Sequence, residues 1–181
     1  MNETLKTIAS RYSCRAFTGE AVDRELLEKI ALAAVQSPSA TNRQCWEIVV
    51  ITDKQMIEDM DNEGMEYLKQ QEDQAVYQRF VDRGGKLFYD APCMFLILIK
   101  PGTELDCGIV SENIALAASS LGLGNVICGM AAVPFSSKNG ESFRRCAGLN
   151  DDMVFGMAVL VGREKTSGEP HEPDLSKIRF I

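Results

Sequence analysis

The sequence has almost no histidine: His171 is the single one among 181 residues. A Ser-His-Asp or Cys-His catalytic site would have to use it, yet its neighbours Pro170, Glu172 and Pro173 are typical of a surface turn. A histidine-rich metal site is excluded, and the carboxylates show no EF-hand spacing. If the chain is an enzyme, we therefore expect its reactive group to come from a cofactor.

Cysteine is present, but it forms no recognisable motif. The six cysteines stand at positions 14, 45, 93, 107, 128 and 146, and no two are three residues apart, which excludes a CxxC redox or zinc motif. A chain of this size needs no disulfides for stability. Most of the thiols are therefore expected to be small buried side chains, while Cys14 and Cys128 remain redox candidates because they lie in segments discussed below.

Positive charge and long apolar runs are also scarce. The 19 lysines and arginines stand against 26 acidic residues, which gives a net charge of −7. Such a chain repels phosphate backbones, so general nucleic-acid binding is excluded, and no basic face for a membrane surface is present. The longest apolar run, 93–99, is far shorter than the ~20 residues that span a bilayer. With no signal peptide at the start, a cytoplasmic protein that binds neither nucleic acid nor membrane is expected.

The composition, 45% hydrophobic and 25% charged, predicts a single globular domain over residues 1–181. Hydrophobic periodicity predicts helices over 5–12, 24–37, 53–71, 105–121 and 140–146, and strands over 46–52, 93–99, 125–128 and 153–161. Helices and apolar strands mixed in this order imply an α+β sheet with helices on its faces. The acidic run from Glu58 to Asp73 is expected to be a solvated surface.

A basic spot stands out near the start of this acidic chain, where residues 1–18 hold three cations against one acid. In an extended segment, residues two apart point to the same side, so Arg11, Ser13 and Arg15 are able to converge on one phosphate and its sugar. The alternative is that the cations complement the dipole at the C-terminal end of a helix. The charges and spacing alone favour this alternative.

Two further segments combine small polar residues with glycine. Residues 37–44 are dense in hydrogen-bonding side chains, which fits either an ordinary loop after a helix or a polar clamp. Residues 122–129 contain three glycines but follow a helix and lack the GxGxxG spacing, so a dinucleotide loop is excluded. No Walker A sequence is present. The glycines would let the backbone approach a flat ligand closely.

Taken together, these segments resemble the flavin-dependent nitroreductase family. The resemblance is carried by RYSCRAF at 11–17, SPSATNRQCW at 37–46, and Gly122-Leu123-Gly124 with Gly129, in the family's order over nearly the whole chain. It implies a nitroreductase-like α+β fold, in which a central mixed β-sheet is flanked by helices, and an intertwined homodimer with FMN at the subunit interface. With the resemblance in view, the phosphate interpretation of the first motif becomes the favoured one.

The resemblance also implies the residues that bind the cofactor. They are Arg11, Ser13 and Arg15 for the phosphate and ribityl chain; Pro38, Ser39, Ala40 and Asn42 for contacts from the partner subunit; Cys128 and Gly129 against the ring, with backbone contacts near its reactive nitrogen; and Lys177 and Arg179 for the phosphate. No catalytic side chain is implied, because the flavin carries the chemistry. Lys86 is an open candidate for the pyrimidine edge.

The sequence departs from the family pattern at three positions. Cys45 stands where the family usually has proline before tryptophan, Cys14 replaces a common aliphatic or small residue, and Ala40 lacks a hydroxyl that many members have. These changes leave the phosphate site intact but weaken the expectation for the partner-side contacts.

The implied activity is hydride transfer from NADH or NADPH, bound transiently, through FMN to nitro compounds, quinones or similar small acceptors. Two alternatives stay open. One is a same-fold flavoenzyme that dehalogenates, oxidises a heterocycle or destroys the flavin, and the other is a flavin-binding dimer without turnover. The sequence alone does not identify the physiological acceptor.

Overall fold

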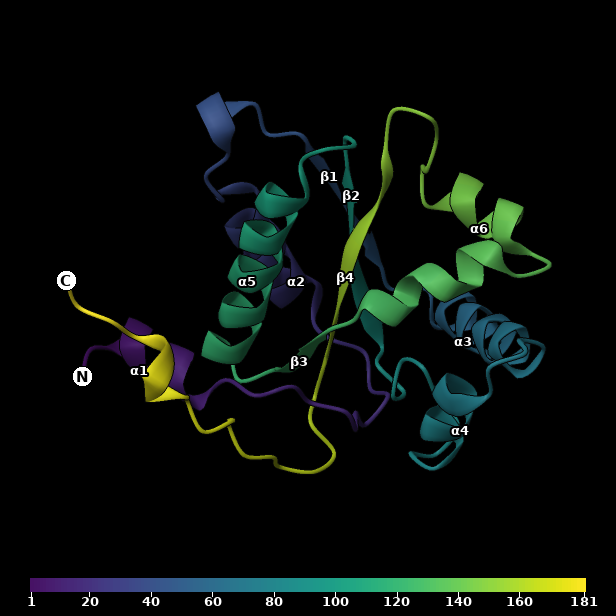
Figure 1. Cartoon of the computed structure of the whole chain (residues 1–181), viewed down its shortest axis with the longest axis horizontal. Coiled ribbons are helices and arrows are strands. Elements are labelled where there is room, and N and C mark those ends of the chain that lie inside the picture. Colours follow the sequence, from purple (N-terminus) through teal and green to yellow (C-terminus); the bar gives the residue numbers. More distant parts are fainter.

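A computed structural model describes all residues, 1–181. Its centre is a four-stranded sheet in the order β1 (Trp46–Ile51), β2 (Cys93–Ile99), β4 (Val154–Gly162) and β3 (Gly124–Ile127) (Figure 1). All three strand pairs are antiparallel. Neighbouring strands are joined through intervening helices rather than hairpins, as the spacing of the strands predicts.

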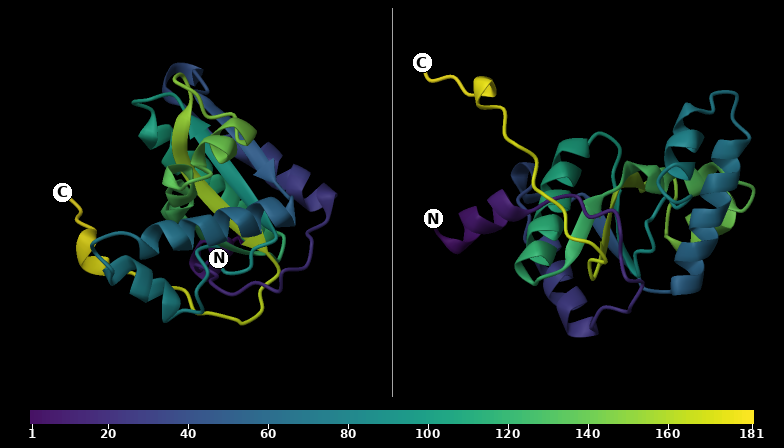
Figure 2. Two further views of the ribbon diagram at one scale, coloured as in Figure 1. Left: turned by 90° about the vertical axis from the view of Figure 1, so that its right-hand side faces the viewer. Right: turned by 90° about the horizontal axis from the view of Figure 1, so that it is seen from below.

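Helices cover both faces of this sheet (Figures 1 and 2). One face is covered by α2 (Arg24–Val35) and α5 (Glu104–Ser120), and the other by α3 (Lys54–Lys69), α4 (Ala75–Val81), the 3-10 segment η2 (Gly129–Ser136) and α6 (Gly140–Cys146). β2 is buried along its whole length because it is apolar on both sides. Its side chains alternate between the two cores without exception. The odd-numbered residues of 93–99 lie in the core beneath α2 and α5, and Met94, Leu96 and Leu98 lie in the core beneath α3.

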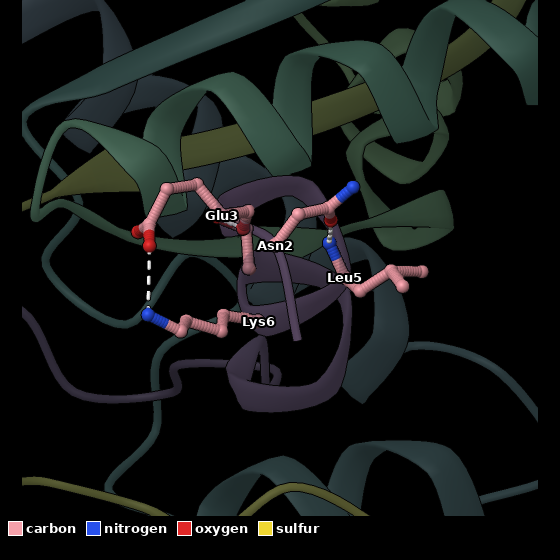
Figure 3. A network of polar contacts seen from close by, with 5 residues as sticks. Asn2, Glu3, Leu5 and Lys6 are labelled. Carbon is pink, nitrogen blue, oxygen red and sulfur yellow. Dashed lines mark hydrogen bonds and ion pairs between the residues drawn. The ribbon is translucent and has the colours of Figure 1, made fainter.

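The first helix, α1 (Glu3–Ser10), is held by local polar contacts (Figure 3). The Asn2 side chain accepts a hydrogen bond of 3.0 Å from the N–H of Leu5, and Lys6 pairs with Glu3 at 2.7 Å. Both contacts are exposed, so each adds little stability. Leu5 and Ile8 of the apolar face are about half exposed, so this face has no cover within one chain.

The predicted fold class is confirmed, and each predicted helix and strand is present with bounds that differ by a few residues. Two differences have physical reasons. The short helix α4 was not predicted, because it is only seven residues long and depends on the Asp73 side chain that accepts from the N–H of Ala75. The expected mixed sheet is antiparallel among its four strands, and the parallel pairing within the chain is an isolated bridge between Ser13 and Asn125.

The C-terminal segment leaves the sheet after β4. Residues 163–181 are exposed throughout and include the 3-10 turn η3 (Leu175–Lys177). Figure 2 shows this segment extending away from the rest of the chain. No helix of the structure combines the length and the apolar character needed to cross a membrane.

Candidate functional site

The first motif, residues 11–15, runs as an extended segment beside β3. Arg11 ends α1 with extended backbone angles (φ −62°, ψ 132°), and the N–H of Cys14 donates to the carbonyl of Asn125 at 2.8 Å. Cys14 is buried against the core, while Arg15 points to solvent. Arg11, Tyr12 and Ser13 are half-buried, so the predicted difference between the two sides of the segment is clear only at Cys14 and Arg15.

The two arginines of the motif have no acidic partner. Arg15 makes one weak contact, from Nη1 to the carbonyl of Ser13 at 3.4 Å, and neither guanidinium forms an ion pair. Arg11 lines a cavity of about 220 Å³ together with Tyr12 and Asn125. Arg11 is the C-cap residue of α1, so the helix-dipole alternative stays open for Arg11, whereas Arg15 lies four residues beyond this cap.

Backbone hydrogen bonds hold the end of the motif in place. The N–H of Phe17 donates to the carbonyl of Tyr89 at 3.1 Å, and the N–H of Thr18 donates to the carbonyl of Arg163 at 3.0 Å. Phe17 is almost fully buried. The motif is thus tied to three distant parts of the chain, namely β3, the segment before β2 and the segment after β4, and this makes it a rigid platform.

The polar loop before β1 contains backbone strain. Thr41, Asn42 and Gln44 all have positive φ angles, of 53°, 56° and 48°, a region that non-glycine residues seldom occupy. Ser39 supports the turn by accepting the N–H of Gln44 at 2.9 Å. Pro38, Ala40 and Asn42 are exposed. Such strain at an exposed loop is typical of binding segments.

Within one chain this loop lies at the opposite end of the sheet from the first motif. Trp46, which follows the loop, pairs with Ile99 at one end of β2, whereas Asn125 beside the motif pairs with Val161, which pairs with Cys93 at the other end. Six residue steps of about 3.3 Å separate the two ends by roughly 20 Å. The structure therefore does not bring these two predicted parts of the site together in a single chain.

Cys128 follows β3 and is buried. Burial raises the pKa of its thiol to about 11, so at neutral pH it is a neutral thiol rather than a nucleophile. Its backbone N–H already donates to the carbonyl of Ala158 at 2.7 Å. A Cβ added at Gly129 would make only an ordinary van der Waals contact, with the Met157 sulfur at 3.9 Å. A backbone contact from this segment to a ligand would therefore come from residues after Cys128.

The basic residues of the tail stand apart from the first motif. Lys177 pairs with Asp174 at 3.7 Å, and no hydrogen bond or ion pair joins Lys177 or Arg179 to residues 11–15. Both side chains are exposed. Their predicted role at the phosphate, like that of the polar loop, is not assembled within one chain.

Asp61 is a residue of the site region that the sequence interpretation missed. It belongs to the acidic run expected to be solvated, yet only 3% of it is exposed. Its carboxylate accepts the N–H groups of Leu87 and Phe88 at 2.8 and 3.1 Å. Burial raises the pKa of this carboxyl, and the two backbone donors act against that rise. A signal was available, since Asp61 follows the buried Ile57 by one helical turn and so lies on the apolar face of α3.

Lys86 lies next to this buried carboxylate. Its ammonium pairs with Asp90 at 3.5 Å, and both residues line a cavity of about 150 Å³ together with Asp61 and Phe17. Cys14 packs nearby on the other side of the motif, and burial raises the pKa of its thiol. Neither thiol of the site region, Cys14 or Cys128, therefore has the character of a redox-active group.

Comparison with known proteins identifies close relatives. Residues 8–163 match the family described as "Nitroreductase family". A crystal structure of a nitroreductase with bound FMN from Desulfitobacterium hafniense is 46% identical, covers 100% of this chain and 99% of that chain, and superposes with a TM-score of 0.96. An Archaeoglobus fulgidus protein, provisionally named NADH dehydrogenase/NAD(P)H nitroreductase, is 27% identical over 96% of this chain and 92% of its own length. An FMN reductase [NAD(P)H] of Bacillus subtilis is 28% identical over 71% of this chain and 55% of its own length.

Proposed function

This chain belongs to the nitroreductase family of oxidoreductases, and from that premise we propose that two copies of it bind FMN and transfer hydride from NADH or NADPH to small acceptors such as nitro compounds or quinones. The observation that carries the proposal is the first motif: two unpaired guanidinium groups flank Ser13 on a pinned, extended segment. The relative from Desulfitobacterium hafniense, which binds FMN, supports the choice of ligand.

The donor set of the first motif fits a phosphomonoester. Arginine presents two parallel N–H donors that match phosphate oxygens. Arg11 is half-buried and Arg15 is exposed, and neither forms an ion pair within 4.0 Å, although Glu164 lines the same cavity as Arg11. Ser13 adds a neutral donor for the sugar chain. Because Cys14 fixes the segment to β3 through a 2.8 Å hydrogen bond, these donors are ordered before the ligand arrives, which lowers the entropic cost of binding.

The separation of the polar loop from the first motif supports a site shared by two subunits. Pro38, Ser39, Ala40 and Asn42 lie roughly 20 Å from the motif of their own chain, so they reach a cofactor only if they belong to the partner. Lys177 and Arg179 on the exposed tail form no hydrogen bond or ion pair with residues 11–15, and we propose that they reach the phosphate in the assembled dimer. We propose a homodimer in which each site takes the motif from one subunit and the strained loop from the other.

FMN, when bound, supplies the hydride chemistry itself. The chain has to position the ring, exclude water and stabilise negative charge on it. Cys128 and Gly129 are proposed to pack against the ring, where Cys128 presents a neutral thiol and Gly129 has no side chain. No general base is required for this transfer.

Anaerobic reduction tests the proposal directly. The purified protein is expected to be yellow and to release FMN on denaturation, identified by its mass. Adding NADH or NADPH without oxygen should bleach the flavin absorbance, and adding a nitro compound or a quinone should restore it. A colourless protein that cannot be reconstituted with FMN would overturn the binding proposal, whereas a yellow protein that neither donor bleaches would favour the non-catalytic flavin-binding dimer.

A further inference from the structure

We propose that Asp61 is a positioning residue, whose buried carboxylate holds residues 86–90 against the end of the first motif and so fixes the platform that carries Arg15. The link itself is carried by hydrogen bonds within the chain. Its consequence for FMN affinity rests on the function proposed above.

The first step is the contact between Asp61 and the segment before β2. Each carboxylate oxygen accepts one backbone N–H, from Leu87 at 2.8 Å and from Phe88 at 3.1 Å. The acceptor comes from α3 and the donors lie 26 and 27 residues further along the chain. Asp61 forms no ion pair within 4.0 Å, since the neighbouring Lys86 pairs with Asp90 instead. A buried carboxylate whose partners are two adjacent backbone donors fixes the path of the chain at those donors.

The second step is the strain that follows this contact. Tyr89 and Asp90 have positive φ angles of 55° and 62° in succession, which non-glycine residues adopt only when surrounding contacts hold them there. The N–H groups bound by Asp61 belong to the two residues just before this turn, and the N–H of Ala91 just after it donates to the carbonyl of Phe88 at 2.9 Å. Asp61 is therefore one of the contacts that hold the turn in its strained form.

The third step leads from the turn to the first motif. The carbonyl of Tyr89, inside the strained turn, accepts the N–H of Phe17 at 3.1 Å. Phe17 is buried and lies two residues after Arg15. If the turn relaxes, the Tyr89 carbonyl rotates away and Phe17 loses this partner. The carboxylate of Asp61 thus acts on Arg15 through the backbone, without touching it.

α3 is also packed closely enough to transmit a displacement. An added Cβ at Gly64, one turn after Asp61, would lie 2.5 Å from Leu87 and 3.2 Å from Pro134 of η2. The helix therefore contacts both the turn before β2 and the segment that follows Cys128. Because no gap separates these elements, a displacement at Asp61 is expected to move the first motif as well.

The test compares Asp61→Asn with two controls. Asp59→Asn removes the same charge from an exposed position of the same helix. Ile30→Val destabilises the other core, beneath α2, and reports what a general loss of stability does. Amide hydrogen exchange is measured on the FMN-free proteins, and FMN affinity is measured by fluorescence titration at a temperature where all variants are folded.

In Asp61→Asn, hydrogen exchange at the amides of Leu87, Phe88 and Phe17 is expected to accelerate together. The Kd for FMN is expected to rise at least tenfold. Asp59→Asn is expected to show neither change. The inference is overturned if the Phe17 amide exchanges no faster than in Ile30→Val, or if Asp61→Asn binds FMN as tightly as Asp59→Asn. If the unmutated protein binds no FMN, the proposed function fails and the exchange at Phe17 alone decides the inference.

A second variant covers the case in which Asp61→Asn does not fold. Asp90→Gly relieves the left-handed strain at an exposed position, so the turn depends less on the carboxylate. In this background Asp61→Asn is expected to fold and to regain part of the lost FMN affinity. The FMN affinity of the double variant is compared with that of Asp61→Asn under conditions where both fold. If the two affinities are equal, Asp61 does not act by opposing strain in the turn.

Discussion

The backbone N–H of Cys14 donates a 2.8 Å hydrogen bond to the carbonyl of Asn125, and this bond places the first motif beside β3. Asn125 is itself tied to α5, because its side-chain amide donates to the carbonyl of Ala115 and to the hydroxyl of Ser119 at 3.1 and 2.9 Å. The position of Arg11 and Arg15 is thus set by a strand and a helix about a hundred residues away in sequence.

Gly124→Ala is expected to disturb this contact. A Cβ at position 124 would lie 3.0 Å from the Cys14 sulfur and 2.6 Å from the Glu164 side chain, so the motif has to shift away from β3. We expect a loss of about 1–3 kcal/mol in the free energy of unfolding, measured by urea denaturation, together with weaker FMN binding. Gly108→Ala is the control, because nothing lies within 4 Å of its added Cβ in α5 and alanine favours helix by about 0.5–1 kcal/mol.

Local pattern was sufficient for much of the fold. The run of seven apolar residues at 93–99 is β2 in full, and Asp53 caps α3 as predicted by accepting the N–H groups of Gln55 and Met56. The extended first motif was predicted in the same way. These features depend on residues that are neighbours in sequence, so a periodic pattern is enough to indicate them.

Features that depend on distant partners were not predictable. The spacing from Ile57 places Asp61 on the apolar face of α3, but no local pattern indicates its pairing with the two donors from another segment, Leu87 and Phe88. In the proposed dimer the polar loop that meets the first motif belongs to a second copy of the chain, and no pattern within one sequence indicates how two copies pack. The predicted site residues therefore stay predictions, supported by the family resemblance and by the geometry of the motif.

Arg11→Ala is expected to weaken FMN binding. One charge-assisted hydrogen bond is worth ~1.5–3 kcal/mol, which corresponds to roughly a ten- to hundredfold rise in Kd. The measurement is quenching of FMN fluorescence on titration with the FMN-free protein. Arg79→Ala, at an exposed position of α4, should leave Kd unchanged, and an unchanged Kd in Arg11→Ala would remove this arginine from the site.

The cysteines are expected to differ sharply in reactivity. Burial raises the pKa of Cys128 to about 11 and that of Cys93 to about 12, whereas Cys146 is exposed. In the folded protein at about pH 8, iodoacetamide should modify Cys146 first and leave the two buried thiols intact until denaturant is added. Peptide mass spectrometry resolves the sites, and rapid labelling of Cys128 would contradict the buried environment described here.

Asp61 should make stability depend on pH. Burial raises the pKa of its carboxyl above the ordinary 3.8, so the folded state holds this proton more tightly than the unfolded chain does. Its stabilising contribution is complete below pH ~4 and is lost as the pH rises through the raised value. The free energy of unfolding of the unmutated protein should fall relative to that of Asp61→Asn as the pH rises above about 4. It should not fall in this way relative to that of Asp59→Asn.

The exposed tail gives the test of the proposed dimer. Four large apolar side chains lie there, and Phe180 is 94% exposed and Leu175 71% exposed in the single chain, an arrangement that favours cover by a partner. Light scattering should therefore report about twice the 20.0 kDa chain mass. Deleting residues 174–181 should weaken the dimer and raise the Kd for FMN, because Lys177 and Arg179 leave with the tail. Val81→Ser, which changes an exposed apolar residue of α4, should change neither the dimer nor the Kd for FMN. If the truncated chain stays dimeric and binds FMN with full affinity, the partner contacts lie elsewhere.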